Sequence, residues 1–242
     1  MRAEDRLKKA IERLKALYGP LSPPGDVSDP FKVLIRTILS QNTSYKNELK
    51  AFRALEEQVG IEPERLASAP EEDIARCIRP AGQHRQRAKR IKEVAKLVLE
   101  RYGGNLWGLL RNKPVLEARE ELMSLPGVGK KTADIVLLFC ARKPVFPVDR
   151  HILRIASRMG LLGPRVDYDA VSELAIRALK PGDYLFAHLA LIRLGREICR
   201  PRKPLCQACP IRDLCDMGSG AQRVGQMAYA PAKPIRSGQP LR

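Results

Sequence analysis

Residues 125–139 read LPGVGKKTADIVLLF, and this stretch decides the fold. Its loop joins one helical pattern over 117–123 to another over 130–140. The loop glycines, Gly127 and Gly129, permit positive φ and a close approach of the backbone. Free N–H groups at the start of the second helix would then point outward and could bind a phosphate group. The stretch therefore predicts a helix–hairpin–helix that binds phosphate, or else a tight corner between two helices with no ligand.

The second helix carries Lys131 in its first turn, on the same side as Ile135 and Leu138. Successive helix positions differ by about 100°, so Lys130 faces another direction. Partial desolvation would lower the pKa of Lys131 below its reference value of about 10.4. A neutral amine is a nucleophile and can form a Schiff base. The alternative is a lysine whose ammonium group simply reaches solvent from the first turn.

A carboxylate follows 18 residues later, in FPVDRHILRIASRMG (146–160). This segment predicts a helix with Val148, Ile152 and Ile155 on its apolar face. Asp149 falls in its first turn, where a negative charge interacts favourably with the helix dipole. On these residues alone, Asp149 is either a member of an active site or an ordinary helix-start aspartate.

Four of the six cysteines lie close together, with the spacing C-x6-C-x2-C-x5-C. They are Cys199, Cys206, Cys209 and Cys215. Four thiolates in one short run can surround a compact centre, whereas zinc ribbons usually join two separated C-x2-C knuckles. The spacing favours a [4Fe–4S] cluster, with zinc or four free thiols as the alternatives. A bound cluster would also fix Arg202 and Lys203 of this loop where they could contact phosphates.

The chain has 242 residues, a formal net charge of +17 and a pI of about 9.9. A surplus of this size indicates a polyanionic partner, most often nucleic acid, rather than only a basic surface. No apolar run approaches the roughly 18 residues of a membrane span, and the amphipathic N-terminus lacks the apolar core of a signal peptide. We therefore expect an intracellular protein of the cytoplasm or nucleoid, with no membrane association, in a compartment that does not favour disulfides.

Apolar residues recur every three to four positions along most of the chain, and no segment alternates cleanly between apolar and polar. We expect an all-α protein of about ten helices, over 4–17, 30–41, 45–58, 70–78, 86–101, 115–124, 129–141, 148–159, 168–179 and 183–198. Residues 218–242 are rich in Gly, Ala, Pro, Gln and Ser and contain no acidic residue. This composition predicts a disordered basic tail.

Together, LPGVGKKTA, VDRH and the cysteine loop resemble the endonuclease III branch of the helix–hairpin–helix DNA glycosylases, over about 29–215. The resemblance implies a two-lobed all-α fold with the cluster loop at the C-terminal end. Its expected parts are a six-helix barrel over 28–130, a helix–hairpin–helix over 115–141 at the lobe junction, and a second lobe of 1–27 with 131–217. Double-stranded DNA would lie across the cleft between the lobes, with the damaged base flipped out of the helix.

The resemblance also implies an activity, that of a base-excision repair DNA glycosylase that is also an AP lyase. Lys131 would be the catalytic amine, which attacks the sugar C1′ as the base leaves. Asp149 would be the catalytic carboxylate, which stabilises the cationic sugar and assists proton transfer. The Schiff base would allow β-elimination and a nick 3′ to the lesion. Oxidised pyrimidines are the default substrates of the family, and we expect a monomer.

Other family positions carry over to the two segments that insert into the duplex. ILSQNTS (38–44) would place Gln41 in the gap left by the flipped base, and AGQHRQRAKRI (81–91) would form the second insertion loop. Many relatives have an apolar wedge where this chain has Gln83, which bears on how the opposite strand is read. Arg85, Arg87, Lys89 and Arg90 either line phosphates or form a solvated basic face. With the hairpin and the cluster loop, the expected DNA-binding residues are Gln41, Asn42, Gln83, His84, Arg85, Gly127, Val128, Gly129, Lys130, Thr132, His151, Arg202 and Lys203.

Several rival functions follow from the same motifs. The adenine-removing branch usually lacks a lysine at position 131 and has a glutamate before the insertion element, but residues 31–41 contain no acidic residue. A monofunctional glycosylase for uracil or mispaired thymine is the open alternative, since base choice depends on the pocket. A non-catalytic DNA-binding clamp is the alternative of another class, and the presence of both Lys131 and Asp149 argues against it. A redox protein would need a second cofactor motif.

Overall fold

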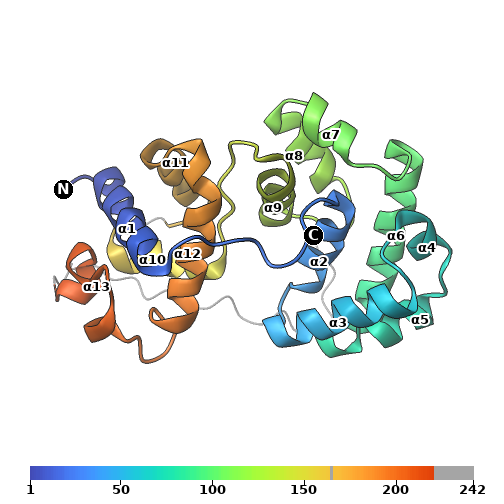
Figure 1. The fold of residues 1–242 in the computed structure, drawn as a ribbon, viewed down its shortest axis with the longest axis horizontal. Helices are drawn as coiled ribbons and strands as arrows, with labels where there is room; N and C mark the ends of the chain where they lie inside the picture. Colours follow the sequence, from blue (N-terminus) through green and yellow to red (C-terminus); the bar gives the residue numbers. More distant parts are fainter. Residues whose placement is uncertain (164–165, 221–242) are drawn as a thin grey trace.

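The computed structural model describes residues 1–163 and 166–220, and every regular element in these ranges is a helix (Figure 1). The α-helices are α1 (Ala3–Tyr18), α2 (Pro30–Leu39), α3 (Tyr45–Gln58), α4 (Pro63–Ser68), α5 (Glu71–Cys77), α6 (His84–Tyr102), α7 (Trp107–Asn112), α8 (Val115–Met123), α9 (Lys130–Ala141), α10 (Arg150–Met159), α11 (Tyr168–Ala178), α12 (Tyr184–Glu197) and α13 (Asp216–Ser219). The 3₁₀-helices are η1 (Arg79–Ala81), η2 (Pro181–Asp183), η3 (Cys206–Ala208) and η4 (Arg212–Leu214).

The helices form two lobes that meet at α9 (Figure 1). In one lobe α2 packs against α3 and α6, while α4 and α5 also pack against α6. In the other lobe α1 packs against α11 and α12, and α10 packs against α12 and α13. α9 contacts α2, α7 and α8 of the first lobe and α12 of the second. The N-terminal helix thus joins the C-terminal helices, and the two-lobed all-α fold expected from the sequence is confirmed.

α9 is buried along most of its length because helices of both lobes pack against it. All residues from Thr132 to Phe139 are buried, whereas a surface helix would keep one polar face. Its first turn differs, since Lys130 is exposed and Lys131 is partly exposed. The first turn is therefore where the central helix meets a solvent-accessible surface.

A buried network ties the two lobes together one turn further along α9. Asp134 is fully buried and accepts hydrogen bonds from Arg119 Nε on α8 at 2.7 Å and from the Tyr168 hydroxyl on α11 at 2.6 Å. Burial, followed by the charge of Asp134, raises the pKa of Tyr168 far above its usual value, so this hydroxyl keeps its proton. Asp134 therefore has one partner from each lobe.

The periodic pattern does not predict α4, α7 or α13, which have 6, 6 and 4 residues. Helices of one or two turns contain too few apolar positions to show a period. The expected tail begins too early, because Gly218 and Ser219 belong to α13. The rest of that tail, residues 221–242, lies outside the described residues. None of the helices in the described ranges combines the length and the apolar composition that crossing a lipid bilayer requires.

Candidate active site

A cleft of about 900 Å³ lies beside the first turn of α9 and takes residues from both lobes. Part of its wall is apolar, with Ile135 and Phe139 of α9. Five residues expected at the functional site line it, namely Gln41, Asn42, Lys131, Asp149 and His151. The structure therefore brings the catalytic candidates and the first insertion segment into one cavity.

Lys131 lies in this cleft without a charged partner in contact. Among residues 1–163 and 166–220, its Nζ makes no hydrogen bond and no ion pair within 4.0 Å. Burial lowers the pKa of Lys131, the carboxylate of Asp149 opposes that shift, and the guanidinium groups of Arg196 and Arg150 add to it. The amine is therefore shifted toward its neutral form, which is the nucleophilic one.

Asp149 is the N-cap of α10, one position before the first turn in which the sequence pattern places it. Its Oδ1 accepts the backbone N–H of His151 at 2.8 Å and that of Ile152 at 2.9 Å. Both bonds use the same oxygen, and no described residue donates to Oδ2. The cap fixes the orientation of the carboxylate, and its second oxygen stays available to a ligand in the cleft.

Arg154 fixes the tautomer of His151. Its Nη2 lies 2.9 Å from His151 Nδ1. Arginine is only a donor, so Nδ1 accepts and the ring proton is on Nε2. Burial lowers the pKa of His151, which keeps the ring neutral near pH 7. Arg154 also donates to the carbonyl oxygens of Gly195 and Cys199, at 2.9 Å each, and thereby joins α10 to the cysteine loop.

His188 of α12 lines the same cleft and was not among the residues predicted from the sequence. It is 1% exposed, its Nδ1 donates to Pro147 O at 2.9 Å, and its ring packs edge-on against Phe139. Burial lowers its pKa to about 4, although the charge of Asp149 opposes that shift. The neutral ring thus holds the backbone two residues before Asp149. A lone histidine inside an apolar helical pattern gives no sequence signal for this contact.

The hairpin loop and the start of α9 present backbone amides to an anion. Gly127 has a φ of +76°, and a Cβ at this position would lie 2.3 Å from Arg90 Cδ. The amide of Val128 is used within the turn, 3.1 Å from a carbonyl oxygen three residues earlier. The amides of Gly129 and Lys130 have no acceptor among the described residues. These two N–H groups, at the N-terminus of a 12-residue helix, suit a phosphate oxygen.

The side chains around the loop already have partners. Lys130 Nζ lies 2.8 and 2.7 Å from the two carboxylate oxygens of Asp169. Gln41 Nε2 donates to Gly127 O at 3.0 Å and lies 3.4 Å from the hydroxyl oxygen of buried Thr132. Gln41 therefore extends from the segment after α2 across to the hairpin, and it lines the same cleft as Lys131.

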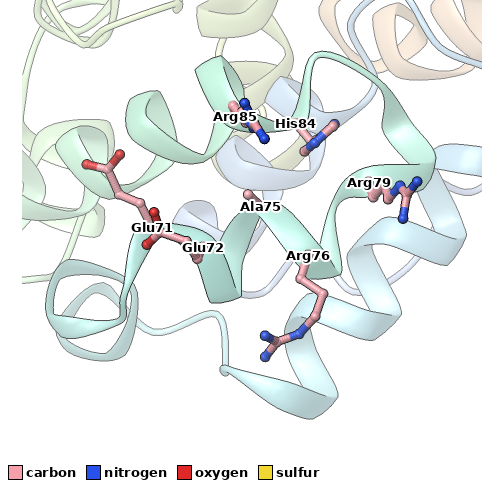
Figure 2. A pocket seen from close by; sticks show the side chains of 7 residues that line it. All are labelled: Glu71, Glu72, Ala75, Arg76, Arg79, His84 and Arg85. Carbon is pink, nitrogen blue, oxygen red and sulfur yellow. The ribbon is translucent and has the colours of Figure 1, made fainter.

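The three expected DNA-binding residues of the second insertion loop lie outside the Lys131 cleft. Gln83 is exposed at the N-cap of α6. His84 and Arg85 line a separate surface hollow of about 950 Å³ (Figure 2). Figure 2 shows these two side chains at the start of α6, with Arg79 of η1 and the helix α5 around the same hollow. This hollow shares no lining residue with the Lys131 cleft.

The cysteine loop supplies four thiols as ligands for a cluster. The four thiols are free and partly buried, and three of them raise the pKa of Cys209 through their charge, after the larger effect of burial. The amide of Ile211 donates to the sulfur of Cys209, as backbone amides do toward a thiolate. In the described ranges, no three His, Cys, Asp or Glu side chains converge closely enough for one ion, which in a zinc site needs sulfurs at about 2.3 Å. Four thiolates in one short run are the donor set of a [4Fe–4S] cluster.

The two cationic residues expected at the cluster loop are exposed. Neither Arg202 nor Lys203 lines the Lys131 cleft, and Lys203 has a φ of +51°. Arg158 of α10 holds the loop from inside, with Nη1 at 3.3 Å from Cys199 Sγ and its carbonyl oxygen at 3.2 Å from Cys215 Sγ. The loop is thus anchored on α10, the helix that Asp149 caps.

Comparisons with known proteins agree with this geometry. Residues 35–181 match the family described as HhH-GPD superfamily base excision DNA repair protein, and residues 199–215 match the iron-sulfur binding domain of endonuclease III. Endonuclease III of Thermotoga maritima is 40% identical over 191 residues, which are 78% of this chain and 84% of the relative.

Two solved structures extend the comparison to the fold. A trapped covalent intermediate of endonuclease III with DNA has a TM-score of 0.79 and 25% identity, and the match covers 92% of this chain and 100% of that one. A thermostable thymine-DNA glycosylase has a TM-score of 0.76 and 26% identity, over 89% and 98% of the two chains. The chain therefore belongs to the HhH-GPD superfamily of base excision DNA repair proteins, in its endonuclease III branch, with a [4Fe–4S] cluster held by its iron–sulfur binding domain.

Proposed function

We propose that this base-excision repair enzyme removes an oxidised pyrimidine from duplex DNA and then cleaves the strand, with Lys131 as the nucleophile. The observation that carries the proposal is the position of Lys131, which has a lowered pKa, no ion-pair partner in contact among the described residues, and Asp149 in the same cleft. A lysine used only for phosphate binding would gain nothing from desolvation, since it would bind as a cation.

The reaction follows from a neutral amine beside a sugar. Lys131 Nζ attacks C1′ while the bond from C1′ to the base breaks, and the base leaves with the bonding electrons and takes up a proton. Opening of the sugar ring then gives a Schiff base between C1′ and Nζ. The Schiff base acidifies the C2′ hydrogen, and loss of that proton expels the 3′ phosphate. The strand is nicked 3′ to the lesion, and hydrolysis frees the lysine.

In this scheme Asp149 acts through its free oxygen. The cap bonds fix Oδ1, so Oδ2 can stabilise positive charge on the sugar and take or return a proton. The absence of an ion pair within 4.0 Å between Asp149 and Lys131 matters, because a close carboxylate would hold the amine as an ammonium ion. His151 and His188 stay neutral and position this carboxylate rather than exchange protons.

The remaining expected residues would hold the DNA. The free amides of Gly129 and Lys130 would bind a phosphate, and Gln41 would leave the hairpin to fill the gap of the flipped nucleotide. Gln83 would meet the opposite strand from the second loop. When bound, the cluster supplies structural order to the loop 199–215, so that Arg202 and Lys203 can contact phosphates.

A monofunctional glycosylase for mispaired thymine or uracil is the second candidate. The likeness to a thymine-DNA glycosylase structure supports it, because the TM-score of that chain, 0.76, is close to the 0.79 of the endonuclease III structure. Such an enzyme would release the base with water as the nucleophile and would form no bond to Lys131.

Borohydride trapping separates the two candidates. We would use duplexes with one thymine glycol, dihydrouracil, uracil opposite guanine, mispaired thymine, 8-oxoguanine or abasic site, for the wild type and for Lys131→Ala. We expect lysine-dependent trapping on the oxidised pyrimidines. Base release from uracil or mispaired thymine without trapping would support the second candidate, and no release from any duplex would point to a DNA-binding clamp.

We also propose that the enzyme is a monomer divided as 28–130 and 131–217, with 1–27 joining the second part, and that it acts in the compartment that holds the genome. Support for the division comes from the packing of α1 against α11 and α12 of the second part. Light scattering of the purified protein, with and without an abasic duplex, tests the monomer.

A further inference from the structure

Arg87 is a buried arginine with no acidic partner. It lies on α6 and is 4% exposed, and no carboxylate of residues 1–163 or 166–220 lies within 4.0 Å of its guanidinium. The sequence left it as a phosphate contact or a solvated basic residue, and its burial excludes both. A buried charge is unfavourable unless hydrogen bonds satisfy it, so the contacts of Arg87 need an explanation.

Its hydrogen bonds go to backbone carbonyls of two separate segments. Nη1 donates to Leu39 O at 3.0 Å and to Ala81 O at 3.1 Å, and Nη2 donates to Gln41 O at 2.7 Å. Leu39 is the last residue of α2 and Gln41 lies two positions after it, whereas Ala81 ends η1. One guanidinium thus joins the segment after α2 to the segment before α6.

Both joined segments lead directly into a strained residue. Asn42 follows Gln41 with a φ of +54°, and Gln83 lies two positions after Ala81 with a φ of +51°. Residues other than glycine rarely adopt this left-handed conformation, and they keep it only where the surroundings enforce it. In the part of the chain that the structure describes, only two further non-glycine residues, Arg142 and Lys203, have positive φ. Half of these strained residues therefore flank the carbonyls that Arg87 holds.

The first of these segments is also tied to the hairpin. Gln41 donates to Gly127 O at 3.0 Å, and both Gln41 and Asn42 line the cleft of Lys131. Displacement of Arg87 would therefore free both loops relative to the catalytic lysine. A guanidinium carries its N–H donors on separate nitrogens and can bond carbonyl oxygens of two segments at once. A lysine carries its three donors on one nitrogen and does not reproduce this geometry.

We propose that Arg87 is a positioning residue that locks the Gln41 loop and the Gln83 loop together, so that both enter the duplex as one rigid unit when a nucleotide is flipped. The inference rests on the proposed function, in which these loops contact opposite strands. It differs from a general stabilising role because it predicts a defect only where a base pair must be opened.

The test compares a substrate that needs base flipping with one that does not. Arg87→Met and Arg87→Lys would be assayed in single turnover on a dihydrouracil duplex, and by borohydride trapping on a single-stranded oligonucleotide with an abasic site. We expect Arg87→Met to lose about 10- to 100-fold on the duplex, since misplacement by an ångström has effects of this size, and less than about 2-fold on the single strand. Arg87→Lys should fall between Arg87→Met and the wild type on the duplex only.

The matched control is Lys92→Met. Lys92 lies on the same helix and donates to one backbone carbonyl, Ala69 O at 2.6 Å, away from both loops. It should keep both activities. A second readout is the fluorescence of 2-aminopurine opposite the lesion, whose rise on binding should be smaller in the Arg87 variants. If Arg87→Met does not fold, Arg87→Lys carries the test.

Other outcomes overturn the inference. Equal losses on the duplex and the single strand, with a matching fall in melting temperature, would make Arg87 a merely structural residue. Full duplex activity in a folded Arg87→Met would show that the loops need no lock. Failure of the wild type to trap an abasic duplex would instead overturn the proposed lysine chemistry, so the two failures are distinguishable.

Discussion

Two ionisable residues one turn apart on α9 differ in how their buried polar groups are satisfied by hydrogen bonds. Asp134 is fully buried, and two strong donors from two other helices satisfy its carboxylate. Lys131 is partly buried in a cleft, and its amine has no hydrogen bond among the described residues. The first arrangement gives a buried carboxylate its hydrogen-bond donors, whereas in the second burial lowers the pKa of the amine and shifts it toward the neutral form.

The difference shows how one helix can serve both stability and chemistry. A buried charge with all its partners contributes to a defined packing, while a buried charge without partners is unfavourable for folding and persists at sites of function. The two turns of α9 should therefore respond in opposite ways to substitution.

The largest effect is expected on the reaction. Lys131→Ala should lower strand nicking and covalent trapping by at least about 10³-fold, because the nucleophile is lost. The neighbouring Lys130→Ala should still form the trapped complex at saturating DNA and should differ in affinity alone. Trapping assays on an abasic duplex measure both. Residual trapping of Lys131→Ala at wild-type level would assign the amine to another residue.

The opposite result is expected for stability. Asp134→Leu should lower the free energy of unfolding by roughly 3 kcal/mol, because Arg119 and Tyr168 lose their common acceptor. Lys131→Met should leave that free energy unchanged or raise it, because the substitution removes a poorly compensated charge. Urea unfolding of the two variants and the wild type gives both values. If Lys131→Met lost as much stability as Asp134→Leu, the expected difference between the two positions would be contradicted.

Acid should lower the stability of the folded protein through His188, which lines the cleft. Its pKa is about 4 in the folded protein and about 6.5 when exposed, so between these values the unfolded chain binds a proton that the folded chain does not. Stability should therefore fall as the pH decreases from 6.5 to 4, by roughly 3 kcal/mol from this residue.

The comparison for that effect is His188→Gln, which keeps a donor for Pro147 O. Unfolding by urea at pH 7 and pH 4.5 should show a smaller acid loss in the variant than in the wild type. His151, whose pKa is also lowered, is present in both proteins and cancels in the difference. Identical pH dependence in the two proteins would contradict the assignment.

The sequence predicted those parts of the site that local motifs encode. The hairpin, the capping carboxylate and the cysteine spacing each depend on residues close together in the chain, and Lys131 and Asp149 were expected from them. Asp134, Arg87 and His188 could not be predicted, because each has a partner 15 to 48 residues away that follows only from how the helices pack. The sequence pattern missed α4 and α7 for a different reason, which is local: both helices are too short for an apolar period to appear.

The smallest effect concerns the exposed neighbour of Lys131. Lys130 and Asp169 form an ion pair at 2.7 Å with side chains 45% and 61% exposed, and such pairs contribute at most about 1 kcal/mol. Asp169→Asn should therefore hardly change the free energy of unfolding. It should tighten DNA binding a few-fold at low salt, because Lys130 becomes free for a phosphate and a repelling charge is removed, with the salt slope steeper by about 0.9. The control Glu173→Gln removes an equal charge from the same helix, where its partner is Arg177 at 3.7 Å. An equal gain in both variants would reduce the effect to net charge, whereas a gain in Asp169→Asn alone would assign the phosphate contact to the first turn of α9.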